Sequence, residues 1–289
     1  MKLARMLQRA SVEESPYPHF VINDAFDGDT LAVLHASLPS MEVITNGADP
    51  GSNKRFTLNW RAALEAERVG PVWKSIIREG IEPAFALRIA EIFRPWITRE
   101  YPDFATRFAP LERFSVVPRV SGQPPESTQL SVDAQIAVNT PALYDGTSVR
   151  IPHLDWMAKL FVGLLYLRPS GDRSEGADLE LYAARDRHPP FDGDRSLPMS
   201  RVRFAKRVPY RDNTLVVFLN TPRSLHGVTP RAATSFPRYF LNFIGEVRDP
   251  LFPVRSVQKE PWETVPARPS LLGRLGGWLA RPVGSRGTV

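Results

Sequence analysis

Residues 214–222 read TLVVFLNTP, an apolar and β-branched run that ends at an Asn and a Pro. A short run of this kind, closed by turn-forming residues, is typical of a strand that is buried in a sheet. Seven similar runs follow Pro110, at 112–120, 130–139, 148–155, 159–168, 177–182, 201–208 and 236–246. Eight short strands in one stretch predict a mainly β core, built as a sandwich, a barrel or a jelly roll.

The residues before Pro110 have a different pattern, because their apolar side chains recur at three-and-four spacing. That spacing indicates amphipathic helices, so the fold class is α+β. The expected elements are a strand at 16–23, a helix at 26–38, a loop at 40–60 and two helices within 61–99, divided at Gly80 and Pro83.

The simplest organisation is one domain over residues 1–249. Its helical part at 1–110 packs against the β-core at 111–249, and a tail rich in Pro and Arg follows at 250–289. The chain shows no internal repeat and no sharp linker, which favours a single domain.

The composition limits the kind of site that the chain can build. Its 289 residues include no cysteine, which excludes disulfides, iron–sulfur clusters and thiolate zinc sites. A metal site must therefore use nitrogen and oxygen ligands, and five histidines are available. The net charge of +6 is spread over scattered Lys and Arg residues, without a nucleic-acid-binding motif, so we expect no nucleic-acid partner.

A candidate metal site begins in the segment 149–155, which reads VRIPHLD. Residues two apart on a strand point to the same side, so His153 and Asp155 can reach one point in space. His226 follows the strand at 214–219 across a turn. Two histidines and one carboxylate can occupy one face of an octahedral iron(II) ion and leave three adjacent positions open. We therefore expect His153, Asp155 and His226 to be metal ligands and catalytic.

Each of these residues also has an ordinary structural interpretation when it is taken alone, as a hydrogen-bonded core histidine or a turn-capping aspartate. A serine hydrolase is disfavoured because no GxSxG motif is present. The remaining histidines, His19, His35 and His188, are interpreted as structural. A nearby acidic cluster, Glu175, Asp178 and Glu180, is interpreted as solvated or as neighbours of the metal ligands that do not bind the metal themselves.

A wider set of motifs accompanies the three ligands in a fixed order. After HLD at 153–155 come LFVGLLYLRP at 160–169, GADLELY at 176–182, TLVVFLNTPRSLHGVTPR at 214–231 and RYFLNF at 238–243. Together they resemble the iron(II)- and 2-oxoglutarate-dependent oxygenase superfamily, on its prolyl-4-hydroxylase-like side. The resemblance covers about 110 residues firmly, from about 135 to 246, and its opening PYPHFVINDAF at 16–26 is similar to the start of such proteins.

The resemblance also assigns the residues that would hold 2-oxoglutarate. A guanidinium can grip the distal carboxylate of this cosubstrate with two hydrogen bonds. Arg238 is preferred for that role because it opens a strand, whereas its rival Arg231 follows Pro230 in an expected turn. By resemblance, Tyr166 hydrogen-bonds the same carboxylate and Asn139 lies near the cosubstrate; Tyr166 taken alone also suits a core tyrosine.

The fold and reaction that the resemblance implies are a double-stranded β-helix, or jelly roll, with N-terminal flanking helices, and hydroxylation of a C–H bond. Fe(II), 2-oxoglutarate and O2 are the implied cofactor and cosubstrates, and 2-oxoglutarate is converted to succinate. Because a carboxylate stands at Asp155, hydroxylation is expected and halogenation is not. The alternative is a non-oxidising, cupin-like jelly roll that binds metal or sugar, which would have no need of Arg238 and Tyr166.

The sequence motifs do not choose the substrate, since peptidyl residues, glycoconjugate sugars and small metabolites all fit them. No peptide-recognition module is visible, which favours a small-molecule or glycoconjugate substrate. The N-terminus lacks an apolar signal-peptide core and no apolar run spans a membrane, so a cytoplasmic location is expected. The segment 271–279 in the tail, LLGRLGGWL, is the candidate for a weak membrane-surface contact, although its glycines disfavour a helix.

Overall fold

The computed structural model describes residues 2–148, 150–187, 189, 191–193 and 195–254. Its α-helices are α1 (Lys2–Met6), α2 (Gly28–Ala36), α3 (Met41–Thr45), α4 (Trp60–Glu65), α5 (Pro71–Gly80), α6 (Pro83–Ile92), α7 (Arg94–Glu100) and α8 (Phe104–Arg107). Short 3-10 helices lie at Leu7–Arg9, Leu111–Arg113 and Met199–Arg201. The segment 271–279, for which a membrane-surface contact was considered, lies outside the described residues.

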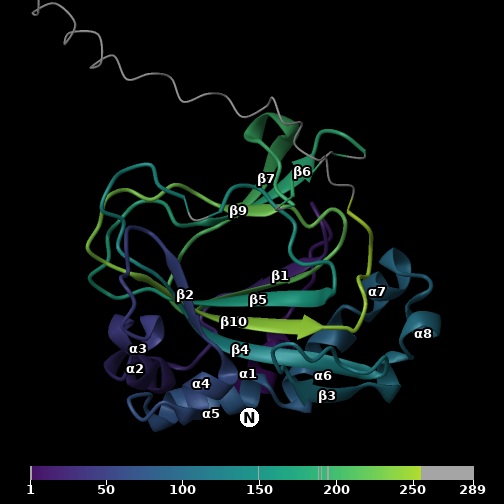
Figure 1. The fold of residues 1–289 in the computed structure, drawn as a ribbon, viewed down its shortest axis with the longest axis horizontal. Coiled ribbons are helices and arrows are strands. Elements are labelled where there is room, and N and C mark those ends of the chain that lie inside the picture. The colour runs from purple at the N-terminus through teal and green to yellow at the C-terminus, as the bar shows by residue number, and fades with distance from the viewer. Residues whose placement is uncertain (1, 149, 188, 190, 194, 255–289) are drawn as a thin grey trace, which may run out of the picture. The chain divides into compact units, whose positions relative to one another are not determined.

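The strands form two sheets, so the fold is a mixed α/β one with a sheet-rich core (Figure 1). The larger sheet has the order β1-β8-β5-β10-β4-β2, with β3 beside β4, and the smaller has the order β7-β6-β9. The strands of the larger sheet are β1 (His19–Ile22), β2 (Arg55–Leu58), β3 (Ser115–Pro118), β4 (Gln129–Asn139), β5 (Lys159–Leu167), β8 (Thr214–Leu219) and β10 (Arg238–Glu246). Those of the smaller are β6 (Leu179–Ala184), β7 (Val202–Val208) and β9 (His226–Val228).

The central strands of the larger sheet are buried on both faces, which explains why β5, β8 and β10 are nearly continuous apolar runs. The helices α4, α5 and α6 cover one face, on the side opposite the smaller sheet (Figure 1). A large hydrophobic cluster fills that layer, with Trp73 and Phe85 of the helices and Phe243 of β10 among its members.

A second, smaller cluster lies between the two sheets. It joins Leu164 and Phe240 of the larger sheet to Leu179 of the smaller one. Polar and ionisable side chains share this interior face, because residues opposite one another in an antiparallel pair point to the same side. On β10 that face carries Arg238, Phe240, Asn242, Ile244 and Glu246, and the functional side chains described below come from it and from its neighbours.

Most of the expected elements are present, among them the strand expected at 16–23, which is β1, and two expectations are corrected. Residues 40–60, expected as a loop, contain α3 and the edge strand β2. Residues 148–155 form no named strand and pair only through isolated bridges. Both β1 and β2 find partners far along the chain, in β8 and β4.

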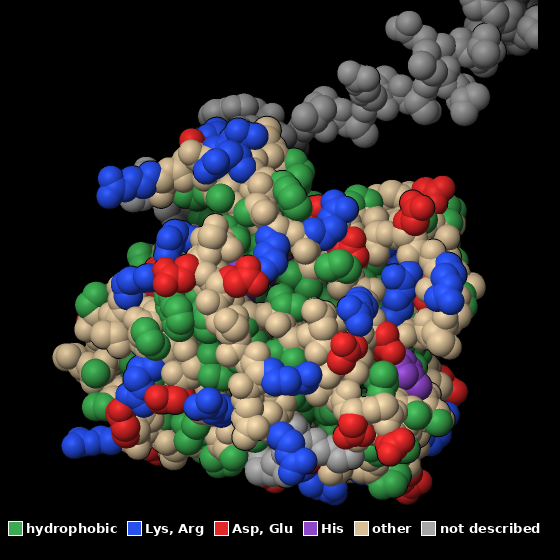
Figure 2. Space-filling view, turned by 180° about the vertical axis from the view of Figure 1, so that it is seen from behind, with side chains coloured by type: hydrophobic (Ala, Val, Ile, Leu, Met, Phe, Trp, Pro, Cys, Tyr) green, Lys and Arg blue, Asp and Glu red, His purple; other side chains and the backbone are tan. Residues whose placement is uncertain are grey.

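The surface mixes the two signs of charge, as Figure 2 shows for one face, where basic and acidic side chains alternate. This agrees with a net charge of +6 that is distributed rather than gathered in one strip. Among the described residues, no helix is both long and apolar enough to cross a membrane.

Candidate metal and cosubstrate site

His153 and His226 meet as directly paired residues of two neighbouring extended segments. The backbone N–H of each donates to the carbonyl of the other, at 3.0 and 3.1 Å, and the ring centroids lie 4.3 Å apart. Gly227 permits this approach, because a Cβ there would meet the backbone of 150–152 at 3.2–3.3 Å. On its other side β9 pairs with β6, so His226 is held between two chain segments.

The orientation of both imidazoles is set by the backbone. His153 Nδ1 lies 2.9 Å from the carbonyl oxygen of Ile151, and His226 Nδ1 lies 2.9 Å from that of Ser224. A carbonyl oxygen only accepts, so each Nδ1 carries the proton and each Nε2 keeps a lone pair. This tautomer, fixed by a hydrogen bond from the other ring nitrogen, is the one in which a histidine binds metal through Nε2.

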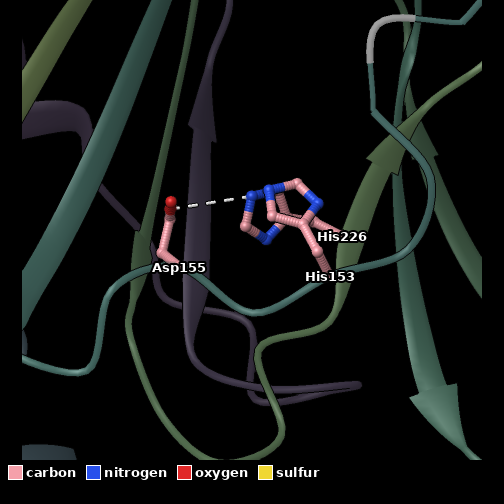
Figure 3. A group of neighbouring side chains, drawn as sticks. All are labelled: His153, Asp155 and His226. Carbon is pink, nitrogen blue, oxygen red and sulfur yellow. Dashed lines mark ion pairs between the residues drawn. The ribbon is translucent and has the colours of Figure 1, made fainter. Parts of the chain in front are cut away.

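Asp155 faces the two imidazoles (Figure 3), and one of its oxygens lies 3.6 Å from His226 Nε2. Its other oxygen accepts a hydrogen bond of 2.9 Å from the ammonium of Lys159, four residues further along the chain at the start of β5. One ligand atom from each of His153, Asp155 and His226 lies within 4.8 Å of the others. The expected extended geometry at 153–155 therefore places both side chains on one side, although no regular strand forms there.

The electrostatics suit a divalent cation. Burial lowers the pKa of His153 well below its ordinary value and lowers the pKa of His226, so both imidazoles are neutral near pH 7. Burial alone would raise the pKa of Asp155, but Lys159 and the two histidines outweigh it, and that pKa lies far below its ordinary value. Two neutral imidazoles and one carboxylate are the donor set that iron(II) accepts with open positions remaining.

Arg238 lies in the same interior, on β10, and is 2% exposed. Its Nε donates to the carbonyl of Ala177 at 3.0 Å and its Nη1 to Asn139 Oδ1 at 3.2 Å. The guanidinium carbon lies 4.8 Å from the ring centroid of Tyr166 and 5.0 Å from that of Tyr210. Its Nη2 is buried and has no hydrogen-bond partner.

Two further donors without partners surround this guanidinium. Tyr166 O–H and Asn139 Nδ2 are both buried and neither has a hydrogen-bond partner. Asn139 stands directly opposite Arg238 in the sheet, and Tyr166 packs on its face. Buried donors without partners are costly, so three of them around one point indicate an acceptor that the protein itself does not supply. A carboxylate has that chemistry.

Arg231 is used differently, although it is also almost fully buried. Its Nη1 donates to the carbonyl of Thr140 at 3.2 Å and its Nη2 to that of Phe236 at 2.8 Å. Both terminal nitrogens thus hold backbone in place. Arg231 Nε is also a buried donor without a partner. What distinguishes Arg238 is that its open Nη2 lies among two further donors without partners, Tyr166 O–H and Asn139 Nδ2.

The sequence patterns do not place two residues that lie beside the site, Lys159 and Arg55. Lys159 begins an apolar strand, and Arg55 lies in the segment that was expected to be a loop. Arg55 stands opposite Asn139 on β2, its guanidinium lies 5.1 Å from the Phe240 ring centroid, and it makes no hydrogen bond within the described residues. It is open to water yet closely surrounded by protein, and these surroundings lower its pKa to about 10. No local sequence signal marks Arg55, because β2 is too short to have a periodicity of its own.

The remaining histidines and acidic residues that the structure describes are structural. His35 Nε2 binds Asp212 at 2.9 Å, and His19 Nδ1 binds the carbonyl of Tyr17 at 2.8 Å. Asp178 accepts from the backbone of Tyr210 at 2.8 Å. Glu180 accepts from Arg207 at 2.6 Å, and His188 lies outside the described residues.

No family model matches the chain, and no curated protein matches it. Among solved structures, a prolyl 4-hydroxylase from Phytophthora capsici matches with 13% identity and a TM-score of 0.45, over 85% of this chain and 64% of that chain. A Pseudomonas putida prolyl-4-hydroxylase matches with 13% identity and a TM-score of 0.43, over 86% of this chain and 100% of that one. HygX from Streptomyces hygroscopicus, solved with nickel and 2-oxoglutarate bound, matches with 14% identity and a TM-score of 0.40, over 79% and 82%. The chain is similar in structure to these proteins.

Proposed function

We propose that the chain is an iron(II)- and 2-oxoglutarate-dependent dioxygenase that hydroxylates its substrate. The observation that carries this proposal is a pair of complementary sites in one interior. His153, Asp155 and His226 offer a metal three ligand atoms, while Arg238, Tyr166 and Asn139 offer an acid three donors without partners. Bound 2-oxoglutarate requires two anchors: a metal for its keto acid end and hydrogen-bond donors for its distal carboxylate.

The two facing sheets with the ligands between them support a double-stranded β-helix, flanked by the N-terminal helices. We infer that residues 1–249 form the oxygenase domain and that 250–289 are a tail. In this arrangement β9 of the smaller sheet carries His226, and β10 of the larger one carries Arg238. The jelly roll thereby brings together residues from distant parts of the chain.

The overall reaction consumes the substrate, 2-oxoglutarate and O2, and yields the hydroxylated substrate, succinate and CO2. One oxygen atom enters the substrate and the other enters succinate. Bound iron(II) supplies the oxygen-activating chemistry, and the protein positions the reactants. His153 and His226 stay neutral and oriented through their Nδ1 hydrogen bonds, and Lys159 holds one oxygen of Asp155 so that the other faces the histidines.

A cupin-like metal or sugar binder is the alternative, and the surroundings of Arg238 argue against it. Such a protein needs the three metal ligands but has no use for buried donors without partners. Leaving a buried donor unsatisfied costs about 1–3 kcal/mol. Three of them in one place are therefore better explained by a second ligand.

The test is a thermal-denaturation series without oxygen. We expect iron(II) and 2-oxoglutarate together to raise the melting temperature by more than the sum of their separate effects, because the metal creates part of the cosubstrate site. In air, the same mixture should form succinate at a slow rate even without added substrate. His35→Ala is the matched control for His153→Ala, since His35 is hydrogen bonded to Asp212 and is not one of the three candidate metal ligands.

Stabilisation by the metal alone, with no additional effect of 2-oxoglutarate and no succinate, would favour the metal-binding alternative. Loss of both effects in His35→Ala as well as in His153→Ala would show that the assay reports folding rather than the site.

A further inference from the structure

A pocket of about 690 Å³ opens beside the candidate metal site. Trp156, the residue after Asp155, lines it, and so does Glu246 at the end of β10. Glu246 stands opposite Lys159 in the sheet, and the ammonium of Lys159 binds Asp155. The pocket and the metal ligands are thus connected through one side chain.

The floor of this pocket is acidic and buried. Glu246 is 8% exposed and Asp133 is 3% exposed. Asp133 is fully engaged, because its two oxygens accept from the backbone of Trp60 at 3.1 Å and from Gln135 Nε2 at 2.7 Å. Glu246 is not: one oxygen pairs with Arg119 at 3.0 Å, and the other, Oε1, is buried without a hydrogen-bond partner.

A second acceptor without a partner lies on the same face of β10. Asn242 donates its amide N–H to Gln135 Oε1 at 2.8 Å, and Gln135 in turn donates to Asp133. Both amides thus point their N–H groups toward the floor, and Asn242 Oδ1 is left as a buried acceptor without a partner. Asn242 does not line the pocket, so the open acceptor that a ligand there can reach is Glu246 Oε1, and such a ligand must donate a hydrogen bond.

The two ends of β10 therefore have opposite requirements. Around Arg238 the open atoms are donors, and from Asn242 to Glu246 they are acceptors. Eight residues separate Arg238 from Glu246, which is about 27 Å of strand. An acid suits the first end and a cation the second, because a buried carboxylate gains most from a charged donor.

The walls of the pocket are aromatic and its rim is basic. Two indoles line the pocket, and each already has a guanidinium over its ring: Arg61 at 5.2 Å from Trp60 and Arg195 at 5.7 Å from Trp156. Such ring faces attract cations. The rim is instead basic, since Arg61, Arg119 and Arg248 line the pocket and are exposed. A basic rim repels a polycation and attracts an acid group.

We propose that this pocket binds the substrate and that the substrate is a small zwitterion, with a protonated amine or guanidinium on Glu246 and an acid group toward the arginine rim. This inference rests on the proposed function for its oxidation step and on the pocket alone for its binding step. Trp156, which lines the pocket, follows Asp155 in the chain, and Lys159, opposite Glu246, binds Asp155; these two residues connect the pocket to the candidate metal ligands.

The probes are two matched pairs that differ in charge and little in shape: arginine with citrulline, and lysine with norleucine. Binding is measured by calorimetry on the intact protein with iron(II) and 2-oxoglutarate, without oxygen. We expect arginine or lysine to bind about tenfold or more tightly than its neutral partner. Agmatine, which lacks the acid group, should bind more weakly than arginine.

Glu246→Gln should remove most of the charge preference, and Glu65→Gln should retain it, because Glu65 is exposed and outside the pocket. Equal or tighter binding of the neutral partners to the wild-type protein overturns the proposal without reference to any variant. Failure of both cations to bind at about 10 mM, far weaker than ordinary substrate binding, also overturns it. If succinate still forms without substrate, only the substrate class has failed; if it does not form, the proposed function has failed.

Discussion

At the scale of single residues, each side chain of the candidate site uses some of its polar atoms in hydrogen bonds within the protein and leaves another atom open. His153 and His226 each use one nitrogen on a backbone carbonyl, and Asp155 uses one oxygen on Lys159. The remaining atom of each faces the others, within 4.8 Å. Arg238 likewise uses two of its nitrogens inside the protein and keeps a third open. The protein orients these groups and leaves the reactive atoms free.

We predict that His153→Ala, Asp155→Ala and His226→Ala each abolish succinate formation. Each change removes one of three ligands from an open metal site, which has no spare protein donor among the described residues. Succinate is quantified under iron(II), 2-oxoglutarate and air, and bound iron is measured in parallel. Normal turnover by any one variant would remove that residue from the metal shell.

We predict that Arg238→Ala mainly weakens the use of 2-oxoglutarate while iron binding persists. Losing a charge-assisted pair in a buried site costs roughly 2–5 kcal/mol, which is on the order of 30-fold or more in apparent affinity. Arg231→Ala should lower the melting temperature instead, because it removes two hydrogen bonds to backbone carbonyls. KM for 2-oxoglutarate, iron content and melting temperature separate the two. The reverse pattern would exchange the roles of the two arginines.

We predict hydroxylation and no halogenation, even in high chloride. In the proposed metal site Asp155 would fill the coordination position that a chloride ion needs, and its negative charge would disfavour a second anion there. Mass analysis of the product of a turning-over substrate, with and without chloride, gives the answer. A chlorinated main product would show that Asp155 does not bind the metal.

At the scale of elements, β10 and α2 show two ways in which a segment contributes to the whole. β10 alternates its side chains, so that one face packs on the helices and the other carries Arg238 and Glu246 into the interior. α2 is joined to the turn before β8 by the pair His35 and Asp212, 2.9 Å apart. That pair is partly exposed and its contribution depends on the protonation of His35.

We predict that this pair stabilises the protein more at about pH 5.5 than at about pH 8.5, by less than about 1 kcal/mol. The hydrogen bond to Asp212 raises the pKa of His35, so folding favours the protonated imidazole. The stabilisation is complete below the unfolded pKa of about 6.5 and is lost as the pH rises through the higher folded pKa. Urea unfolding of wild type and His35→Gln at both pH values measures the difference. An equal difference at both pH values would contradict the pairing.

At the scale of the whole molecule, three layers are stacked: helices, larger sheet and smaller sheet (Figure 1). The layer between the helices and the larger sheet is closely packed where α5 ends. A Cβ on Gly80 would lie 2.8 Å from Ala134 Cβ and 2.8 Å from a ring carbon of Phe243. The absence of a side chain at Gly80 thus sets how near α5 lies to β4 and β10.

We predict that Gly80→Ala destabilises the protein by about 1–2 kcal/mol. Overpacking a core costs roughly 1–3 kcal/mol, and the helix propensity gained by Ala offsets at most about 1 kcal/mol of that. Gly28→Ala is the matched control, since a Cβ at Gly28 meets nothing within 4 Å and the residue also lies in a helix. Unfolding free energies from urea titrations compare the two. A stabilised Gly80→Ala would mean that the layers can separate without cost.

The sequence by itself determined the type and approximate bounds of β4, β5, β8 and β10, because an apolar run buried on both faces is a local signal. It also indicated His153, Asp155 and His226 as a set that could hold a metal, and the structure brings them within 4.8 Å of one another.

Only the tertiary structure decided which distant residues meet. The three-residue strand β9 and the edge strand β2 are too short to have their own periodicity, and they exist because β6 and β4 offer them partners. The link from Asp155 through Lys159 to Glu246, and the placement of Arg55 beside Phe240, arise from pairing between segments far apart in sequence. Sequence periodicity predicts whether a side chain points into the core or to the surface. Which residue it contacts there is decided by tertiary packing.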